Sequence, residues 1–473
     1  MTSRKIASNV KWAVVIYVLS FPLIWGRVNS VMASDVTYQR DYTYQASESD
    51  SKISCRTIAL EQVKRLLLEE LGSYLVSQTE VKNYQISRDQ VNAITAGIVK
   101  TEVLKENWDG KTFYIIAKIT TDPSQVAKAV DELRKDKQGL SELEEVKKRT
   151  EELLIGLAKL REEVKLLKGG ERTREKKDYM EAVQKLDAVD YFREGYALAE
   201  SGKYRDAISF YDKAIDADPR HSTAYSARGW AHYKIGDYPS ALKDNTRALD
   251  LKPDFPGALA NRSTTLWGMR QYDKALADIN RAIELKPDYS RAYEVRSLIY
   301  LYMKKNVNAI EDGNKAIELN PNNSYAYLNR GNAYRNIGSY EEAFKDYQKT
   351  IEITPANPNV YHSRGYAYFL RKRYDDALRD MNKALELNKN PVTPLFSPVT
   401  ALYLRGLVCN QLKDHEGAIR DFSKVIEFEA DNAGAYYQRS LSYKQLGKAD
   451  ESASDLKKAA QFRDVQAQKA VHK

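Results

Sequence analysis

Arginines and aspartates recur in a fixed register through the second half of the sequence, and their side chains could pair. Five arginines stand 34 residues apart, and an aspartate follows each of them after 16 residues. A guanidinium group binds a carboxylate through two parallel hydrogen bonds, and it can equally bind an acidic ligand. Because every arginine has its own acid, we predict structural ion pairs rather than a basic ligand-binding stripe. The pairs are Arg228 with Asp244, Arg262 with Asp278, Arg296 with Asp312, Arg330 with Asp346, and Arg364 with Asp380; Arg405 with Asp421 and Arg439 with Asp455 continue the register.

The residue types that usually carry catalysis or bind metals lack the spacing that such chemistry needs. The five histidines and two cysteines contain no His-Glu-x-x-His or paired-cysteine pattern. The glycines near Gly202 and Lys203 are wrongly spaced for a phosphate-binding loop. Cys409 falls in an apolar register, which is typical of an inert thiol. We therefore predict no enzymatic activity, no cofactor and no metal.

The positive net charge does not indicate a nucleic-acid partner. The chain has 74 basic and 65 acidic residues, a formal charge of +9. Four of the basic residues precede Ser34, where there are no acids, so the remainder carries only +5. That charge is spread over mixed-sign segments rather than gathered in runs. No nucleic-acid partner is predicted.

Residues 1–33 are typical of an export signal. A basic start is followed by an apolar run, Trp12 to Trp25, and then by Val31-Met32-Ala33, which suits a signal peptidase. We predict cleavage after Ala33 and a location in the periplasm or cell envelope of a bacterium. The alternative is an uncleaved anchor, although the run of 14 residues is shorter than the ~20 that span a bilayer.

Residues 34–122 predict a small α/β module. The segment 36–44 alternates as a strand does, and 54–77 has apolar residues at helical spacing. Ser87, with Gln90 three residues later, predicts a second, shorter helix. A hairpin with strands at 98–106 and 111–121 follows, its turn supplied by Asn107 to Gly110. The pattern resembles the N-terminal domains of some bacterial envelope and flagellar-assembly proteins.

Residues 123–170 predict a helix and a coiled coil. Apolar positions between 143 and 167 alternate in steps of three and four, which is a coiled-coil seam. We expect this seam to join copies of the chain into a dimer or trimer; the alternative is a single amphipathic helix laid against the preceding module. Gly169-Gly170 ends the helix, and a charged linker covers 171–187. The seam consists of Leu143, Val146, Thr150, Leu153, Leu157, Leu160, Val164 and Leu167.

From residue 188 to 466 one unit repeats every 34 residues. Prolines mark the unit ends, and two positions hold small residues in each unit, for example Gly331 and Ala343. This period with these residues resembles the tetratricopeptide repeat family. The resemblance implies a mainly α fold in which eight antiparallel helix pairs stack into an α-solenoid. The units are 188–221, 222–255, 256–289, 290–323, 324–357, 358–391, 399–432 and 433–466, with a proline-rich insertion at 392–398 that either breaks the superhelix or displays a partner contact.

The resemblance also implies where a partner would bind. In the family, ligands lie in a concave groove lined by the first helix of each unit, and here those positions are rich in aromatic residues. We expect about half of these rings to belong to the core instead. The lysine and asparagine pair of the family's chaperone-binding subset is absent, so capture of a C-terminal carboxylate in that style is not predicted. The groove candidates are Tyr196, Trp230, Tyr233, Trp267, Tyr302, Asn332, Arg335, Asn336, Tyr366 and Phe369.

The combined pattern predicts a non-enzymatic exported scaffold or adaptor. It would bind a protein or peptide in the groove, and the coiled coil would allow a homo-oligomer. The alternative is a structural spacer subunit of an envelope or secretion assembly, in which a neighbouring subunit fills the groove.

Overall fold

The computed structural model describes residues 35–47, 50–77, 99, 101–122, 126, 137–166, 169–388 and 397–462. The predicted export signal, the short helix predicted after Ser87 and most of the 392–398 insertion lie outside these residues. None of the helices in the described ranges combines the length and the apolar character that crossing a membrane requires.

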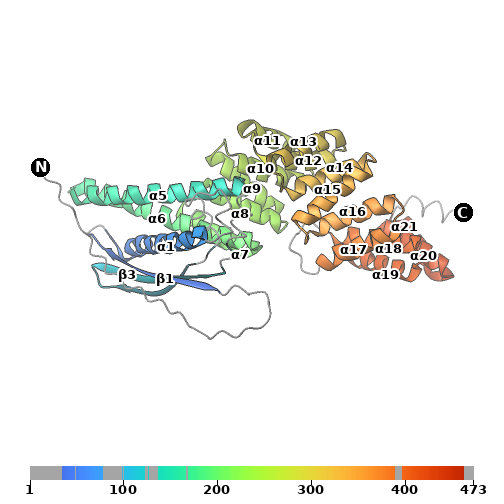
Figure 1. Ribbon diagram of the computed structural model, residues 1–473, viewed down its shortest axis with the longest axis horizontal. Coiled ribbons are helices and arrows are strands. Elements are labelled where there is room, and N and C mark those ends of the chain that lie inside the picture. The colour runs from blue at the N-terminus through green and yellow to red at the C-terminus, as the bar shows by residue number, and fades with distance from the viewer. Residues whose placement is uncertain are drawn as a thin grey trace. The chain divides into compact units, whose positions relative to one another are not determined.

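The predicted N-terminal α/β module is confirmed. Strands β1 (Val36–Gln45), β2 (Thr101–Trp108) and β3 (Thr112–Thr121) form an antiparallel sheet in the order β1-β3-β2. Helix α1 (Lys52–Ser77) covers one face of this sheet (Figure 1). The β2–β3 turn is closed by Asp109, whose carboxylate accepts hydrogen bonds from two backbone N–H groups of the turn at 2.8 and 2.6 Å.

The module's core follows from the alternation of side chains along β3. Its four inward residues, from Phe113 to Ile119, are fully buried, while the residues between them remain partly exposed. Val63, Leu67 and Leu71 of α1 are fully buried in the same cluster. An antiparallel sheet with one covered face and one solvated face produces this pattern.

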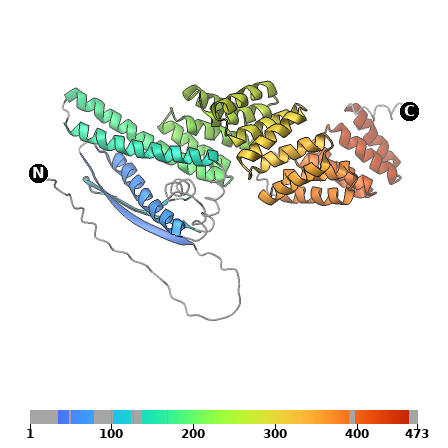
Figure 2. The ribbon, with the colours of Figure 1, turned by 45° about the horizontal axis from the view of Figure 1, so that its top comes forward.

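The middle of the predicted seam for self-association is occupied inside the chain, as far as its side chains are described. Helix α5 (Lys137–Leu166) packs along α6 (Gly169–Glu200), and Figures 1 and 2 show the two side by side. Leu157 is buried in the module's core cluster, and Leu153 and Leu160 pack against it. The expectation of a coiled coil between copies is therefore corrected to the alternative, an amphipathic helix packed within its own chain. The three-four spacing marks one buried face but not the partner that covers it.

The charged segment predicted as a linker, residues 171–187, is part of α6. Its charged residues favour helix, and no proline interrupts them. Tyr179, Val183 and Leu186 lie on one face of α6 and are buried in the module's core. The same helix then supplies the first helix of the first repeat, so the module and the array share one continuous element.

The predicted α-solenoid of eight helix pairs is confirmed (Figure 2). The C-terminal part of α6 pairs with α7 (Tyr204–Ala217), and seven further pairs follow. They are α8 (Ser222–Lys234) with α9 (Tyr238–Leu251), α10 (Pro256–Gly268) with α11 (Tyr272–Leu285), α12 (Ser290–Tyr302) with α13 (Asn306–Leu319), α14 (Ser324–Asn336) with α15 (Tyr340–Ile353), α16 (Pro358–Leu370) with α17 (Tyr374–Leu387), α18 (Pro398–Gln411) with α19 (His415–Phe428), and α20 (Ala433–Gln445) with α21 (Ala449–Gln461).

Small residues let the two helices of each pair approach closely. A Cβ atom added at Gly331 would lie 3.0 Å from Tyr347 Cε1 and 3.2 Å from Asp346 Cβ. Three units have serine at the same position, and two of these serines, Ser263 and Ser297, use the close approach to donate to backbone carbonyls of the facing helix at 2.7 Å. The small-residue register is therefore a packing feature.

We expect Gly331→Val to destabilise the array by about 1–3 kcal/mol, because its side chain would overpack the contact with Tyr347. Denaturant unfolding followed by circular dichroism measures the change. Gly156→Val, in α5, is the matched control, because nothing lies within 4 Å of an added Cβ there. Equal unfolding midpoints for the two variants would contradict this account of the register.

Candidate functional site

The first helices of the repeats line the inner side of the array. Each first helix contacts the first helix of the next unit, from α6 to α20, whereas the described second helices make no comparable contacts with one another. A stack whose one layer lies closer together than the other must curve toward the closer layer. We call the surface formed by α6, α8, α10, α12, α14, α16, α18 and α20 the first-helix face.

Side chains two units apart meet on this face. The Arg291 guanidinium of α12 lies 4.3 Å from the ring centroid of Trp230 on α8, and Lys234 Nζ lies 4.8 Å from the same ring. Arg291 also donates to Asn261 Oδ1 of the intervening helix at 2.7 Å. Trp230 stacks on Tyr233 with ring centroids 5.2 Å apart. Strong curvature brings these residues together, and we call Trp230, Lys234, Arg291 and Glu294 the cationic cluster.

Burial shifts the ionisation of the cluster. It lowers the pKa of Lys234 to about 8, with the positive charge of Arg291 acting in the same direction. It raises the pKa of Glu294 to about 7, partly offset by Arg291, Asn323 and Lys234. Burial also raises the pKa of Tyr325, across the face, to about 12. The acids that act on Lys234 are Glu294 and, as a smaller cause, Glu200 of α6; near neutral pH the carboxyl group of Glu294 is only partly ionised.

A second polar group lies farther along the face. Arg335 donates to Asn332 and Asn336 at 3.1 Å, and its guanidinium lies 5.0 Å from the Tyr366 ring. Tyr347 OH also donates to Asn332 at 3.0 Å. Burial, with Arg335 as a second cause, lowers the pKa of His362 to about 4, so this histidine is neutral at physiological pH. The asparagine amides already have partners within the chain.

The groove candidates separate into exposed and packed residues. Tyr302 is 56% exposed and Tyr366 is 37% exposed, and Asn336 is also exposed. Tyr233 is buried at 2%, and Tyr196 packs against the cores of both the module and the first repeat. The remaining candidates are partly buried: Trp230, Trp267, Asn332, Arg335 and Phe369.

Sequence reasoning missed Lys234, Arg291 and Glu294. All three occupy first-helix positions that the family resemblance assigns to the groove, so their register was available as a signal. They are charged, whereas most of the predicted groove candidates are aromatic. Their proximity across two units depends on the curvature of the stack, which no single unit encodes.

The arginines of the 34-residue register are held by bidentate ion pairs. Arg330 donates from Nε and Nη2 to Asp346 at 2.8 and 2.6 Å, and its Nη1 reaches Asn314 of the preceding unit at 2.7 Å. The other six arginines pair with their aspartates in the same bidentate way, at 2.6–2.9 Å. Tyr327 packs 5.6 Å from the Arg330 guanidinium. The geometry assigns Arg330 to scaffold contacts within and between units.

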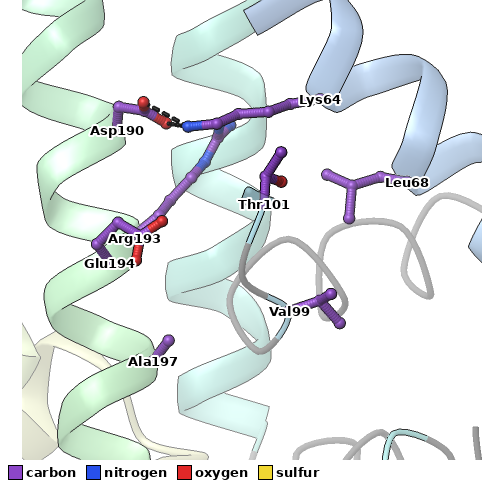
Figure 3. A pocket seen from close by; sticks show the side chains of 8 residues that line it. All are labelled: Lys64, Leu68, Val99, Thr101, Asp190, Arg193, Glu194 and Ala197. Carbon is purple, nitrogen blue, oxygen red and sulfur yellow. Dashed lines mark hydrogen bonds and ion pairs between the residues drawn. The ribbon is translucent and has the colours of Figure 1, made fainter. Parts of the chain in front are cut away.

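A pocket lies between α1, the start of β2 and α6 (Figure 3). Lys64 forms an ion pair with Asp190 there, and Arg193 bonds Glu61 at 3.1 Å and Thr150 Oγ1 at 2.8 Å. Burial raises the pKa of Glu61, with Arg193 acting against it. Burial also raises the pKa of Asp190, but Lys64 outweighs it and the net shift is downward. These paired charges join the module to the array.

In the described part of the chain, no group of three or more His, Cys, Asp or Glu side chains is placed to hold a metal ion. Both cysteines, Cys55 and Cys409, are buried thiols, and burial raises the pKa of the Cys409 thiol to about 11. A thiol with a raised pKa is a poor nucleophile at neutral pH.

Comparison with known protein families matches the array in successive segments. Family models described as "Tetratricopeptide repeat" match residues 192–256, 261–324, 313–345, 358–391, 399–432 and 433–463, and a family model described as "TPR repeat" matches residues 331–371. Together the matches run from residue 192 to residue 463 and leave out only 257–260 and 392–398. A search of curated proteins by sequence finds no match.

Comparison with solved structures finds similar chains. A chain in the crystal structure of the APC/C hetero-tetramer Cut9-Hcn1 is 15% identical with a TM-score of 0.52; the match covers 70% of this chain and 62% of that one. A tetratricopeptide repeat protein from Parabacteroides merdae is 20% identical with a TM-score of 0.42, covering 54% and 98%. MamA is 27% identical over 34% of this chain and 93% of its own, with a TM-score of 0.29.

Proposed function

We propose a function from one premise: this chain belongs to the tetratricopeptide repeat family. Repeat arrays of this kind present extended concave surfaces and typically mediate protein–protein interactions. Within that class, we assign this chain the role of a non-enzymatic scaffold or adaptor that holds a protein or peptide on the first-helix face.

The exposed aromatic side chains of the first-helix face carry this proposal. Tyr302 and Tyr366 present large rings on the inner side of the array, at 56% and 37% exposure. Tyrosine supplies apolar contact area together with a hydroxyl, at low cost in conformational entropy. An exposed aromatic surface of this kind suits a peptide or helix from a partner.

We expect the double variant Tyr302→Ala, Tyr366→Ala to lose its partner while remaining folded, because neither ring is buried. Affinity capture from the native envelope with mass spectrometry identifies the partner, and a pull-down measures its retention. Phe428→Ala is the matched control, since Phe428 is 63% exposed at the end of α19, a second helix. Undiminished capture by the double variant would exclude this face as the binding surface.

A structural spacer within an envelope or secretion assembly is the alternative function. The same double variant separates the two roles, because a spacer would change its assembly state in sedimentation rather than lose a captured partner. Tyr233 and Trp267 are unsuitable for this test, since Tyr233 is buried and Trp267 packs in a core cluster.

Export to the periplasm or cell envelope is a further part of the proposal. Its support is the sequence of residues 1–33, with a basic start, an apolar run and small residues before Ser34. Mass spectrometry of the protein purified from its native cells tests it. A mature chain that begins at Ser34 is expected, and an intact N-terminus would favour the uncleaved anchor.

A further inference from the structure

The cationic cluster has an ammonium group that forms no ion pair within the described residues. Lys234 is half-buried, and within the described residues its Nζ forms no ion pair; its contacts are with the rings of Trp230 and Tyr204, at 4.8 and 5.8 Å. Arg291 lies on the same Trp230 ring and also donates to Asn261. Two cations are thus gathered on one aromatic surface.

The electrostatic balance of this cluster favours an anion. The charge of Arg291 lowers the pKa of Lys234, which shows that the two cations repel each other. Glu294 on α12 and Glu200 on α6 oppose this repulsion, each by less than Arg291 contributes to it. The raised pKa of Glu294 also weakens its negative charge near neutral pH. A carboxylate placed beside Lys234 and Arg291 would relieve this repulsion.

From this arrangement we infer that the first-helix face binds an acidic segment of its protein partner, with an aspartate or glutamate side chain seated between Lys234 and Arg291 over Trp230. Apolar residues of the segment would then contact exposed rings such as Tyr302. This inference rests on the proposed function and specifies the chemistry of the partner.

Other partner chemistries fit less well. A purely apolar segment would cover the Lys234 ammonium without neutralising it, and burying an unpaired charge is costly. A basic segment would add a third cation. A nucleic acid would need cations along a backbone track, whereas Lys234 and Arg291 lie together on one ring and Arg335 lies apart from them on another, that of Tyr366.

A random-peptide display selection on the full chain tests the inference. The peptides are displayed between two flanking domains, so no free C-terminal carboxylate is present. We expect aspartate and glutamate to be enriched among the selected peptides, and a representative peptide to bind Lys234→Met, Arg291→Met about tenfold more weakly than the unaltered chain. Lys243→Met is the control, because Lys243 is exposed on the second helix α9. Circular dichroism verifies that each variant is folded.

The possible outcomes separate the inference from the proposed function. Selected peptides without acidic enrichment, or equal affinity for both variants, would overturn the acidic-segment inference and leave a peptide-binding scaffold in place. Failure to select any peptide above background, together with no partner in the capture experiment, would overturn both. Binding of a single-stranded oligonucleotide in preference to the peptides would likewise overturn the inference.

The cluster also predicts how affinity depends on pH. Lys234 is protonated below its pKa of about 8, and Glu294 becomes fully charged above its pKa of about 7. Raising the pH through this range therefore removes the positive charge of Lys234 and completes the ionisation of Glu294. Both changes weaken binding of an acidic peptide, whose own carboxylates stay ionised throughout.

We expect the affinity for a selected acidic peptide to fall from pH 6 to pH 9, measured by the fluorescence anisotropy of a labelled peptide at low salt. The charged groups that act on Lys234 are Glu200 from α6 and Arg291 and Glu294 from α12. Lys234→Met should flatten the upper part of the profile. An affinity that stays constant between pH 6 and pH 9 would contradict this assignment of the cluster.

Discussion

Arg330→Ala is expected to lower the free energy of unfolding by about 3–5 kcal/mol, the range for removing one partner of a buried ion pair. Asp346 is only 4% exposed, so its carboxylate would lose both hydrogen bonds without access to water. The contact to Asn314 would also be lost, which weakens the joint with the preceding unit. Denaturant unfolding measures the loss of unfolding free energy. We expect hydrogen exchange to become faster in α14 and α15, where the ion pair lies.

Arg281→Ala is the matched control for this prediction. Arg281 also pairs with two carboxylates, Asp254 and Glu284, but all three side chains are at least half exposed. Exposed pairs contribute little because water solvates the separated charges well. Similar destabilisation by both variants would contradict a special role for the buried register. Lost partner binding with unchanged unfolding of Arg330→Ala would identify Arg330 as a ligand contact instead.

Arg193→Met is expected to loosen the junction between the N-terminal module and the array, at a cost of about 3–5 kcal/mol. The side chain of Glu61 is 6% exposed, and Arg193 neutralises it while also bonding Thr150 of α5. Without Arg193 the Glu61 carboxylate is buried beside Asp190 with Lys64 as the remaining nearby cation. Faster hydrogen exchange in α1 and α5, with the distal repeats unchanged, would report the loosening.

The pH dependence of this variant provides an internal check. Burial raises the pKa of Glu61, so the folded state takes up a proton on Glu61 more readily than the unfolded chain does. The destabilisation should therefore shrink as the pH falls from neutral, because a protonated Glu61 no longer needs a counter-charge. Arg65→Met is the control, since Arg65 is exposed on α1. A destabilisation that is independent of pH would locate its cause elsewhere.

The repeat fold could be predicted from the sequence because its pattern is local. The glycine and alanine registers, the repeat ends and the spacing of 16 residues between Arg330 and Asp346 all lie within one helical hairpin. Residues in such a hairpin meet whenever the hairpin forms, so their pairing follows from the unit alone. The sheet could also be predicted from local patterns, because residues 36–44 alternate as a strand does and Asn107 to Gly110 supply the turn of the hairpin.

The sequence by itself thus determined the repeat fold, the N-terminal module and the arginine–aspartate register. Only the tertiary structure decided what covers the apolar face of α5, that residues 171–187 continue as helix, and that Arg291 reaches Trp230 and Lys234 from two units away. The physical reason is the same in each case. These contacts depend on how one element is placed against another, and the spacing of residues along a single helix specifies a buried face without specifying its partner.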